Sequence, residues 1–274
     1  MVAIAVTIAG SDSGGGAGIQ ADLKTFSALG VYGASVIAAL TAQNTKGVTG
    51  IHDIPPEFVT AQLDAVYSDL KVQATKIGML SRPATIEAVA AGLKKYSAKN
   101  VVLDPVMVAA SGDRLLVPEA VDTIKRLLFP LADIITPNLA EAAALLDQPL
   151  AKHENEMAAQ GEALLALGAK AVLVKGGHAP TKHAVDVLIE PSGVRRFTAE
   201  RIETQHTHGT GCTLSSAITA GLAKGLALHD AIAAAKNYIT GALQAGVNLG
   251  IGTGRGPVHH FHQLWAKLGT PLKP

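Results

Sequence analysis

The sequence predicts an α/β protein of three layers, in which a mostly parallel central sheet carries helices on both faces. Short runs rich in β-branched residues alternate with longer alanine-rich segments, and this alternation is typical of a parallel sheet covered by helices. The mean hydropathy is high, +0.29, and it comes from Ala, Val, Ile and Leu, as expected of strands buried on both faces. The 274 residues contain no linker, repeat or low-complexity tract, so we expect one domain spanning residues 1–274.

Short apolar runs mark the predicted strands, and longer periodic segments mark the helices. Pro56, Pro83 and Pro118 each stand where the first turn of a helix tolerates proline. The predicted strands are Ala3–Ala9, Ser35–Leu40, Ala74–Ile77, Val101–Leu103, Asp133–Thr136 and Ala171–Lys175. The predicted helices are Ala17–Leu29, Pro56–Leu70, Pro83–Ser97, Pro118–Phe129, Leu139–Asp147, Glu154–Leu167, Gly211–Gly225 and His229–Leu249.

Two alternating runs, Ala184–Glu190 and Val194–Glu200, flank the turn residues Pro191-Ser192-Gly193. This pattern predicts an antiparallel hairpin near an edge of the sheet.

The composition argues against several classes of partner. The net charge is +1 and aromatic residues make up 4%, so nothing favours nucleic acid or a membrane surface. A single cysteine fits a reducing compartment. The segment Met1–Ala9 enters an apolar run without a basic lead, so we expect no signal peptide and a cytoplasmic protein.

The run His208-Gly209-Thr210-Gly211-Cys212-Thr213 is the most informative part of the chain, because two glycines bracket a threonine where a helix should begin. Their backbone freedom and the helix N-terminus together predict a pocket for an anion. A thiol placed there has a lowered pKa and can act as a base or nucleophile. The alternative is a glycine turn in which Cys212 is a small buried hydrophobe.

The glycine-rich segment from Gly10 to Gly18 follows the first strand. It matches neither the dinucleotide fingerprint nor a Walker A loop. So many glycines indicate a close approach, either to a ligand or to another stretch of backbone.

Further polar residues follow other strands, where ligands bind in such sheets. The amide of Gln43 could pair with an aminopyrimidine, or could be solvated in a loop. Asp104 suits metal or phosphate handling, or a turn. Glu141 could hold Mg²⁺, or could form a capping box with Asn138. Lys175, before two glycines, suits a phosphate contact or a solvated surface position.

The cluster His259-His260-x-His262 has no carboxylate or cysteine cluster to accompany it, so we do not predict a metal site there.

Seven motifs in order resemble the hydroxymethylpyrimidine/phosphomethylpyrimidine kinases of thiamine biosynthesis, in the ribokinase-like superfamily. The resemblance runs from Ile4 to Phe261. Its motifs are A-G-S-D-x-x-G-G-A-G-I-Q-A-D-L-K, T-A-Q-N-T, L-D-P-V-M-V, T-P-N-x-x-E-A, V-K-G-G-H, H-G-T-G-C-T-L-S-S-A and G-P-V-H-H-F.

The resemblance implies a ribokinase-like fold, a homodimer and phosphoryl transfer from ATP to a hydroxymethylpyrimidine and then to its monophosphate. It implies that Gly209, Thr210, Gly211 and Cys212 cradle the phosphoryl group, with Cys212 where most of the superfamily has an aspartate base. Asp104 and Glu141 would organise Mg²⁺. The implied pyrimidine pocket is Gly10, Asp12, Asp22, Gln43, Met79 and Val106, and the implied ATP site includes Asn138, Lys175 and Lys236.

We expect Cys212 to accept the substrate proton late, with a pKa lowered by the helix end. We expect Ala109–Arg114 to close over the substrate. A pyridoxal or pyridoxine kinase is the nearest alternative, because its substrate is also a flat ring with a hydroxymethyl arm. A non-catalytic sensor of a vitamin precursor is a remote alternative, and a nicotinamide-dependent dehydrogenase lacks its fingerprint.

Overall fold

The computed structural model describes residues 2–107, 115–177 and 182–268. Within these ranges the strands form one nine-stranded sheet in the order β3-β2-β1-β4-β5-β6-β7-β8-β9. The strands β2, β1, β4, β5, β6 and β7 run parallel, and β3, β8 and β9 are antiparallel to their neighbours. Their bounds are β1 Ile4–Asp12, β2 Tyr32–Asn44, β3 Gly47–Asp53, β4 Ala74–Ile77, β5 Val101–Leu103, β6 Ile134–Ile135, β7 Val172–Lys175, β8 His183–Glu190 and β9 Gly193–Glu200.

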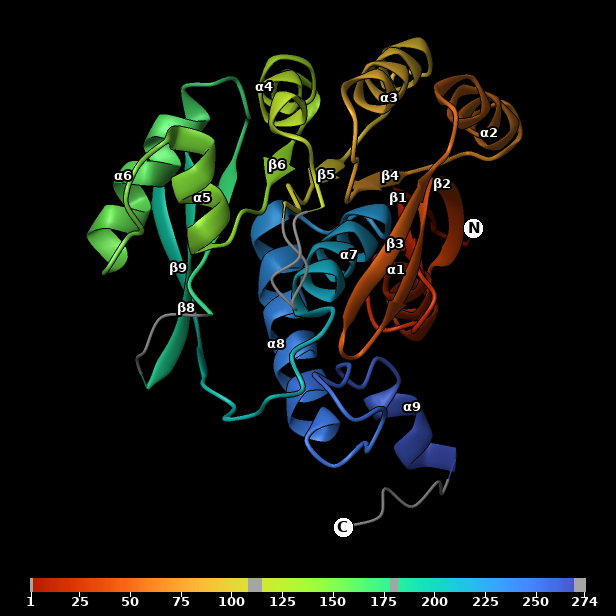
Figure 1. Ribbon diagram of the computed structural model, residues 1–274. Helices are drawn as coiled ribbons and strands as arrows, with labels where there is room; N and C mark the ends of the chain where they lie inside the picture. The colour runs from red at the N-terminus through yellow and green to blue at the C-terminus, as the bar shows by residue number, and fades with distance from the viewer. Residues whose placement is uncertain (1, 108–114, 178–181, 269–274) are drawn as a thin grey trace.

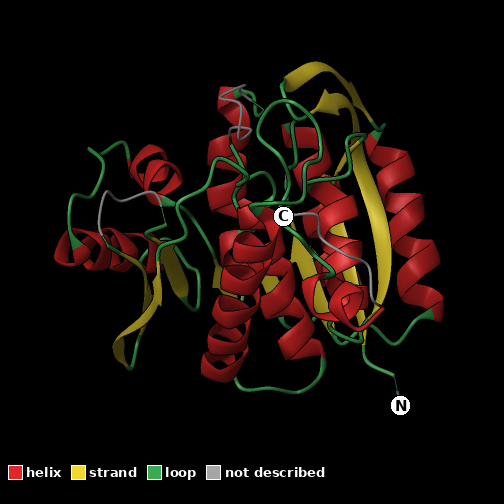
Figure 2. Ribbon diagram, turned by 90° about the horizontal axis from the view of Figure 1, so that it is seen from below, coloured by secondary structure: helices red, strands yellow, loops and turns green. Residues whose placement is uncertain are grey.

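Helices cover both faces of the sheet, which gives the predicted three layers (Figures 1 and 2). On one face lie α1 Gly18–Ala28, α7 Thr210–Ala223 and α8 Leu228–Gly246. On the other lie α2 Pro56–Asp69, α3 Pro83–Lys95, α4 Pro118–Leu127, α5 Leu139–Leu146 and α6 Glu154–Leu165. Short elements complete the chain: the 3₁₀ turn Phe129–Leu131, the helix α9 His262–Trp265 and the 3₁₀ turn Ala266–Leu268.

The alternation of side chains along β1 shows how the two cores form. Val6 and Ile8 are fully buried in the core beneath α2 to α6. Ala5 is buried in the second core, beneath α1, α7 and α8. A strand with apolar residues on both faces needs helices on both sides, as the composition indicated.

All six predicted strands are present, and the predicted hairpin is β8 paired with β9 at the edge of the sheet. The prediction was wrong at the opposite edge. There β2 continues through Gln43, and the unpredicted strand β3 returns beside it. The polar residues and glycines of this hairpin give it the composition of a loop. Its outer parts are exposed, so these strands do not need alternating apolar residues, and the usual strand pattern is missing.

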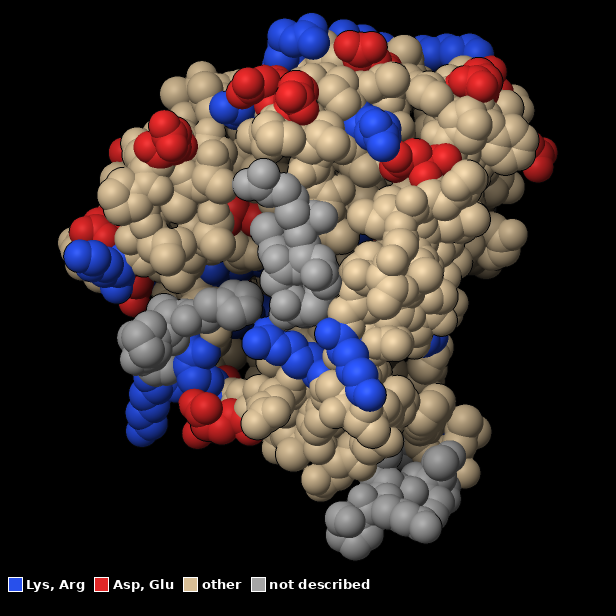
Figure 3. Space-filling view, viewed as in Figure 1, with Lys and Arg blue, Asp and Glu red and all other residues tan. Residues whose placement is uncertain are grey.

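Side chains of both signs are interspersed along the upper rim in Figure 3, consistent with the small net charge. None of the described helices is both long enough and apolar enough to span a membrane. The expected lid, Ala109–Arg114, lies outside the described residues.

Candidate active site

The turn before α7 forms the centre of the site. Gly209 caps the helix with φ +80° and ψ +6°, in the left-handed region. A Cβ at this position would also collide with the backbone carbonyl oxygen of Gly16. Glycine is therefore needed at residue 209 for both its backbone angle and its contact.

The first turn of α7 offers backbone donors to an anion. The Thr210 N–H and hydroxyl both donate to the Thr207 carbonyl, at 3.2 and 2.7 Å, and this fixes the start of the helix. Helix geometry gives the N–H groups of Gly211 and Cys212 no partner within α7. They add to the positive end of a helix of 14 residues.

Lys175 stands directly beside this turn, at the carboxyl end of β7. Its Nζ donates to Oδ1 of Asp104 at 2.8 Å and lies 4.0 Å from Oε2 of Glu141. A Cβ built on Gly211 would lie 3.3 Å from the Lys175 Nζ and 3.6 Å from Oδ2 of Asp104. The structure thus brings together Gly211, Lys175, Asp104 and Glu141, which come from four separate parts of the sequence.

Ionisation of these groups follows from their burial and mutual contacts. Burial disfavours the charge of Asp104, but Lys175 and then Lys76 outweigh it and lower its pKa. Burial likewise opposes the charge of Lys175, yet Asp104 and Glu141 raise its pKa. Burial dominates at Glu141 and raises its pKa to about 7, despite the nearby Lys175.

Asn138 and Glu141 do form the capping box that the sequence allowed. The Asn138 side chain accepts from the Glu141 N–H at 2.9 Å, and Oε2 of Glu141 accepts from the Asn138 N–H at 2.7 Å. The Lys175 N–H donates to the Pro137 carbonyl at 2.8 Å, so the cap is tied to β7. Glu141 therefore caps α5 and also lies at the site.

The donor set beside Lys175 is compatible with Mg²⁺. Asp104 and Glu141 offer carboxylate oxygens from two elements, and Mg²⁺ is commonly bound by one or two carboxylates together with phosphate oxygens and water. Among the residues that the structure describes, no group of three or more His, Cys, Asp or Glu side chains is placed to hold a metal.

Asp12 organises the glycine-rich loop from within. Its Oδ1 accepts from the Gly14 N–H, and its Oδ2 from the N–H groups of Gly16 and Ala17, all at 2.8–2.9 Å. Nε2 of His208 lies 2.8 Å from the same Oδ2. Burial disfavours the charge of Asp12, but these partners lower its pKa overall. The carboxylate expected to bind the pyrimidine thus joins this loop to the turn before α7.

Three of the expected pocket residues lie near the ends of β1, β4 and β5. A Cβ built on Gly10 would lie 2.5 Å from Cε of Met79, so a larger residue at position 10 would displace that side chain. Val106 is half-buried, and its N–H donates to the Asp104 carbonyl at 2.8 Å. Gln43 is half-buried on β2, where its Oε1 accepts from the Thr41 hydroxyl at 3.0 Å.

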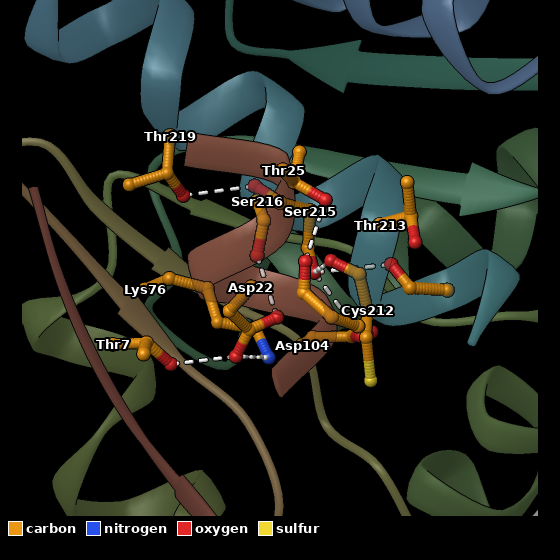
Figure 4. A network of polar contacts seen from close by, with 12 residues as sticks. Thr7, Asp22, Thr25, Lys76, Asp104, Cys212, Thr213, Ser215, Ser216 and Thr219 are labelled. Atoms are coloured by element: carbon orange, nitrogen blue, oxygen red, sulfur yellow. Dashed lines mark hydrogen bonds and ion pairs between the residues drawn. The ribbon is translucent and has the colours of Figure 1, made fainter. Parts of the chain in front are cut away.

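Asp22 does not lie at the surface of a pocket; it is fully buried within α1. Its Oδ2 accepts from the Thr7 hydroxyl at 2.6 Å and from Lys76 Nζ at 2.9 Å, and its Oδ1 accepts from the Ser216 hydroxyl at 2.6 Å (Figure 4). Both carboxylate oxygens of Asp22 therefore have hydrogen-bond partners from other elements of the fold.

The expected lowering of the Cys212 pKa is wrong for this structure. Burial dominates and raises the pKa of the thiol to about 11. Lys76 and the Gly18 N–H act in the opposite direction, while Asp22 and Asp104 add to the increase. The helix end alone does not overcome desolvation and two neighbouring carboxylates.

Lys236 lies further along the same face, paired with Asp186 of β8. Its Nζ donates to Oδ2 of Asp186 at 2.7 Å, and Oδ1 of Asp186 accepts from the Gly176 N–H at 3.0 Å. Lys236 thus reaches the site indirectly, through the residue that follows Lys175.

Sequence reasoning missed Lys76, Asp186 and Ser216. Lys76 gave a signal that could have been used, because a lysine within a central strand buried on both faces needs a partner. In the histidine cluster, Nε2 of His260 lies 3.1 Å from the Thr213 hydroxyl and forms a hydrogen bond with it. Burial lowers the pKa of His260 to about 3.

Comparison with known proteins supports the family resemblance that the sequence motifs indicated. A hydroxymethylpyrimidine/phosphomethylpyrimidine kinase of Rhizobium meliloti (strain 1021) is 60% identical over 97% of this chain and 99% of its own length. A crystal structure of Bacillus subtilis pyridoxal kinase as an ADP complex matches with a TM-score of 0.89 and 39% identity, over 96% of this chain and 99% of that one.

A crystal structure of phosphomethylpyrimidine kinase from Clostridium difficile 630 matches with a TM-score of 0.78 and 46% identity, over 89% of this chain and all of that one. The family model described as phosphomethylpyrimidine kinase matches residues 12–259. The glycine turn, the paired Asp104 and Lys175 and these matches agree, and the chain belongs to the phosphomethylpyrimidine kinase family, with the ribokinase-like fold.

Proposed function

We propose that this chain transfers a phosphoryl group from ATP to the hydroxymethyl arm of 4-amino-5-hydroxymethyl-2-methylpyrimidine, and then a second one to the monophosphate, giving the diphosphate used in thiamine biosynthesis. The observation that carries the proposal is the position of Lys175, beside both Asp104 and the donor-lined turn at Gly211. The names of the relatives supply the substrate class.

The chemistry asks mainly for positioning and for neutralised charge, because phosphoryl transfer passes through a loose transition state. N–H groups of the α7 turn bind the equatorial oxygens of the moving group, and Lys175 offsets part of their charge. Asn138 and Lys236 hold the loops on either side of Lys175 and thereby shape the ATP site.

Asp104 and Glu141 would hold Mg²⁺, directly or through water, together with the phosphates of ATP. The ion, when bound, supplies charge neutralisation between phosphate oxygens. Glu141 must release its proton to serve as a ligand, and its raised pKa makes that release part of metal binding.

The Cys212 thiolate would accept the proton of the substrate hydroxyl, so that the O–H bond breaks and an S–H bond forms as the oxygen attacks phosphorus. A thiol with a pKa of about 11 is mostly protonated at neutral pH, so groups that favour the thiolate matter for this step.

The substrate ring would lie against Gly10, Met79 and Val106, with the Gln43 amide pairing to the amino group and ring nitrogen of the pyrimidine. Asp12 and Asp22 would contribute by holding the surrounding backbone and helix rather than by touching the ring.

We also propose a cytoplasmic homodimer. The single cysteine suits a reducing compartment. Apolar side chains are exposed on β2, β3 and α2, at Tyr32, Leu40, Ile51 and Phe58, and a second copy would cover some of them.

The test is an assay of ADP release with ATP and Mg²⁺, run separately on the hydroxymethylpyrimidine, its monophosphate and pyridoxal. The proposal expects turnover on the first two substrates that exceeds turnover on pyridoxal. Faster turnover on pyridoxal would favour the second candidate, a pyridoxal kinase, which the likeness to the Bacillus subtilis enzyme keeps open. Failure to release ADP with every ring would favour a non-catalytic sensor.

A further inference from the structure

A fully buried lysine lies in the middle of the sheet, and the mechanism above does not use it. Lys76 has 0% exposure and is the third residue of β4, an otherwise uncharged strand. Its Nζ contacts Oδ2 of Asp22 at 2.9 Å, and both side chains are fully buried. Burying two charges is costly, and an apolar pair of the same size is often as stable, so stability alone does not explain this pair.

The pair is rigidly placed. Thr7 is the register partner of Lys76 across β1 and β4, and its hydroxyl donates to the same Asp22 oxygen at 2.6 Å. A Cβ built on Gly78 would lie 2.6 Å from the Lys76 Nζ, so the glycine leaves room for the ammonium. The charge is thus held at a fixed point below the carboxyl end of β4.

The geometry connects this charge to Cys212. Ser216, whose hydroxyl donates to Oδ1 of Asp22 at 2.6 Å, follows Cys212 by four residues on α7. Residues four apart share one face of a helix, so the Cys212 side chain lies over the Asp22–Lys76 pair. Figure 4 shows Lys76, Asp22, Asp104 and Cys212 gathered in this region.

Four charged groups act on Cys212 from the elements packed around it. Lys76 on β4 and Lys175 at the end of β7 are cationic, while Asp22 on α1 and Asp104 after β5 are anionic. Lys175 is already bound to Asp104 at 2.8 Å. Lys76 and Asp22 therefore form a second, deeper pair, whose two members favour opposite protonation states of the thiol.

We propose that Lys76 is a positioning residue for phosphoryl transfer: its fixed ammonium favours the thiolate of Cys212, and Asp22 limits that effect. The proposal deepens the proposed function and rests on it only for the consequence in turnover. The influence of Lys76 on the thiol can be tested without any substrate.

The influence of the neighbouring charges on the thiol agrees in sign with this role. Burial raises the pKa of the Cys212 thiol, and Lys76 is the foremost group that lowers it. Burial opposes the charge of Lys76 itself, but Asp22 and then Cys212 and Asp104 raise its pKa, so the ammonium stays charged.

The experiment measures the rate of Cys212 alkylation by iodoacetamide between pH 7 and 10, in the protein without ligands. Cys212 lies among mostly buried groups, and this burial raises its pKa, but the residue keeps partial exposure to solvent and so can meet the reagent. It is the only cysteine in the chain, so the reaction reports one thiol. We expect Lys76→Met to slow alkylation at pH 8 about tenfold and Asp22→Asn to accelerate it about tenfold, each corresponding to about one pKa unit. The double variant should react at close to the original rate.

Opposite directions in the two single variants are the decisive result. Both variants break the same ion pair, so a purely structural role would change the reactivity in one shared direction, and that result would overturn the proposal. If Lys76→Met does not fold, Asp22→Asn and the double variant still differ only at residue 76, and the double variant must react more slowly.

Lys236→Met is a matched control, because it removes another buried Lys–Asp contact of 2.7 Å on a different part of the sheet. It should leave the alkylation profile of Cys212 unchanged, and an equal shift there would also overturn the proposal. If alkylation shifts as expected but the pH profile of turnover does not, the proposed base role of Cys212 fails while the role of Lys76 on the thiol stands.

Discussion

The ammonium of Lys175 lies 2.8 Å from Oδ1 of Asp104, and the contact sits directly beside Gly211 in the donor-lined turn. A cation and a carboxylate in this arrangement leave the local charge close to balanced before ligands arrive. Under the proposed function, bound phosphates and Mg²⁺ would add charge of both signs, so that Lys175 would gain an anionic partner and Asp104 a cationic one.

Replacing Lys175 with Met should lower kcat about a hundredfold, because the moving phosphoryl group loses a neutralising cation. The free energy of unfolding should also fall, by about 3 kcal/mol, since Asp104 keeps its buried charge without this partner. Steady-state kinetics and urea unfolding measure the two effects.

Lys170→Met is the control for that variant. Lys170 contacts Asp133 at 2.7 Å but is 65% exposed, so its loss should cost less than about 1 kcal/mol and leave turnover unchanged. Equal losses in the two variants would contradict the role assigned to Lys175.

Gly209→Ala should reduce both stability and turnover, because the new Cβ meets the Gly16 carbonyl and the residue keeps a positive φ. Gly225→Ala is a close comparison: its φ is +85°, and nothing lies within 4 Å of the added carbon. The comparison variant should cost only about 1 kcal/mol, from the backbone angle, and should retain turnover. Thermal unfolding and ADP release, measured for both variants, separate the effect of the positive φ from the effect of the collision with the Gly16 carbonyl.

Cys212→Ser should lower kcat by about ten- to a hundredfold and leave the KM for ATP nearly unchanged, because a serine hydroxyl remains protonated and is a poorer proton acceptor. Its smaller change in shape leaves the turn at Gly209 in place. Turnover equal to that of the original protein would remove the cysteine from the mechanism.

Asp12→Asn should destabilise the protein in a pH-dependent way. The folded structure lowers the pKa of Asp12, so its charge stabilises the fold above the ordinary pKa of about 4, and this contribution is lost as the pH falls through the lowered value. The difference in unfolding free energy between the original and Asp12→Asn should therefore shrink as the solution is acidified from about pH 4 through the lowered pKa of Asp12. Asp69→Asn, at an exposed position on α2, should show no comparable difference.

Structure could be predicted from the sequence where a residue or segment has one dominant physical requirement. Gly209 requires a positive φ, and the alternation of strands and helices requires two helical layers, so both could be predicted. Glu141 shows the limit of such reasoning: its spacing from Asn138 predicted a capping box, and the structure has the box as well as a place 4.0 Å from Lys175.

Long-range electrostatics could not be predicted from local patterns. The pKa of Cys212 depends on desolvation and on Lys76, Asp22 and Asp104, which are far apart in the chain. Desolvation and the two carboxylates raise this pKa and outweigh both Lys76 and the helix end. Asp12 and Asp22 stand in a motif, but the motif alone does not show that hydrogen bonds from distant segments engage their carboxylates.

The contact between Gly16 and Gly209, reinforced by Asp12 and His208, joins the loop after β1 to the turn before α7. The loop after β1 and the turn before α7 should consequently shift as one body, so that a movement at either segment is transmitted to the other.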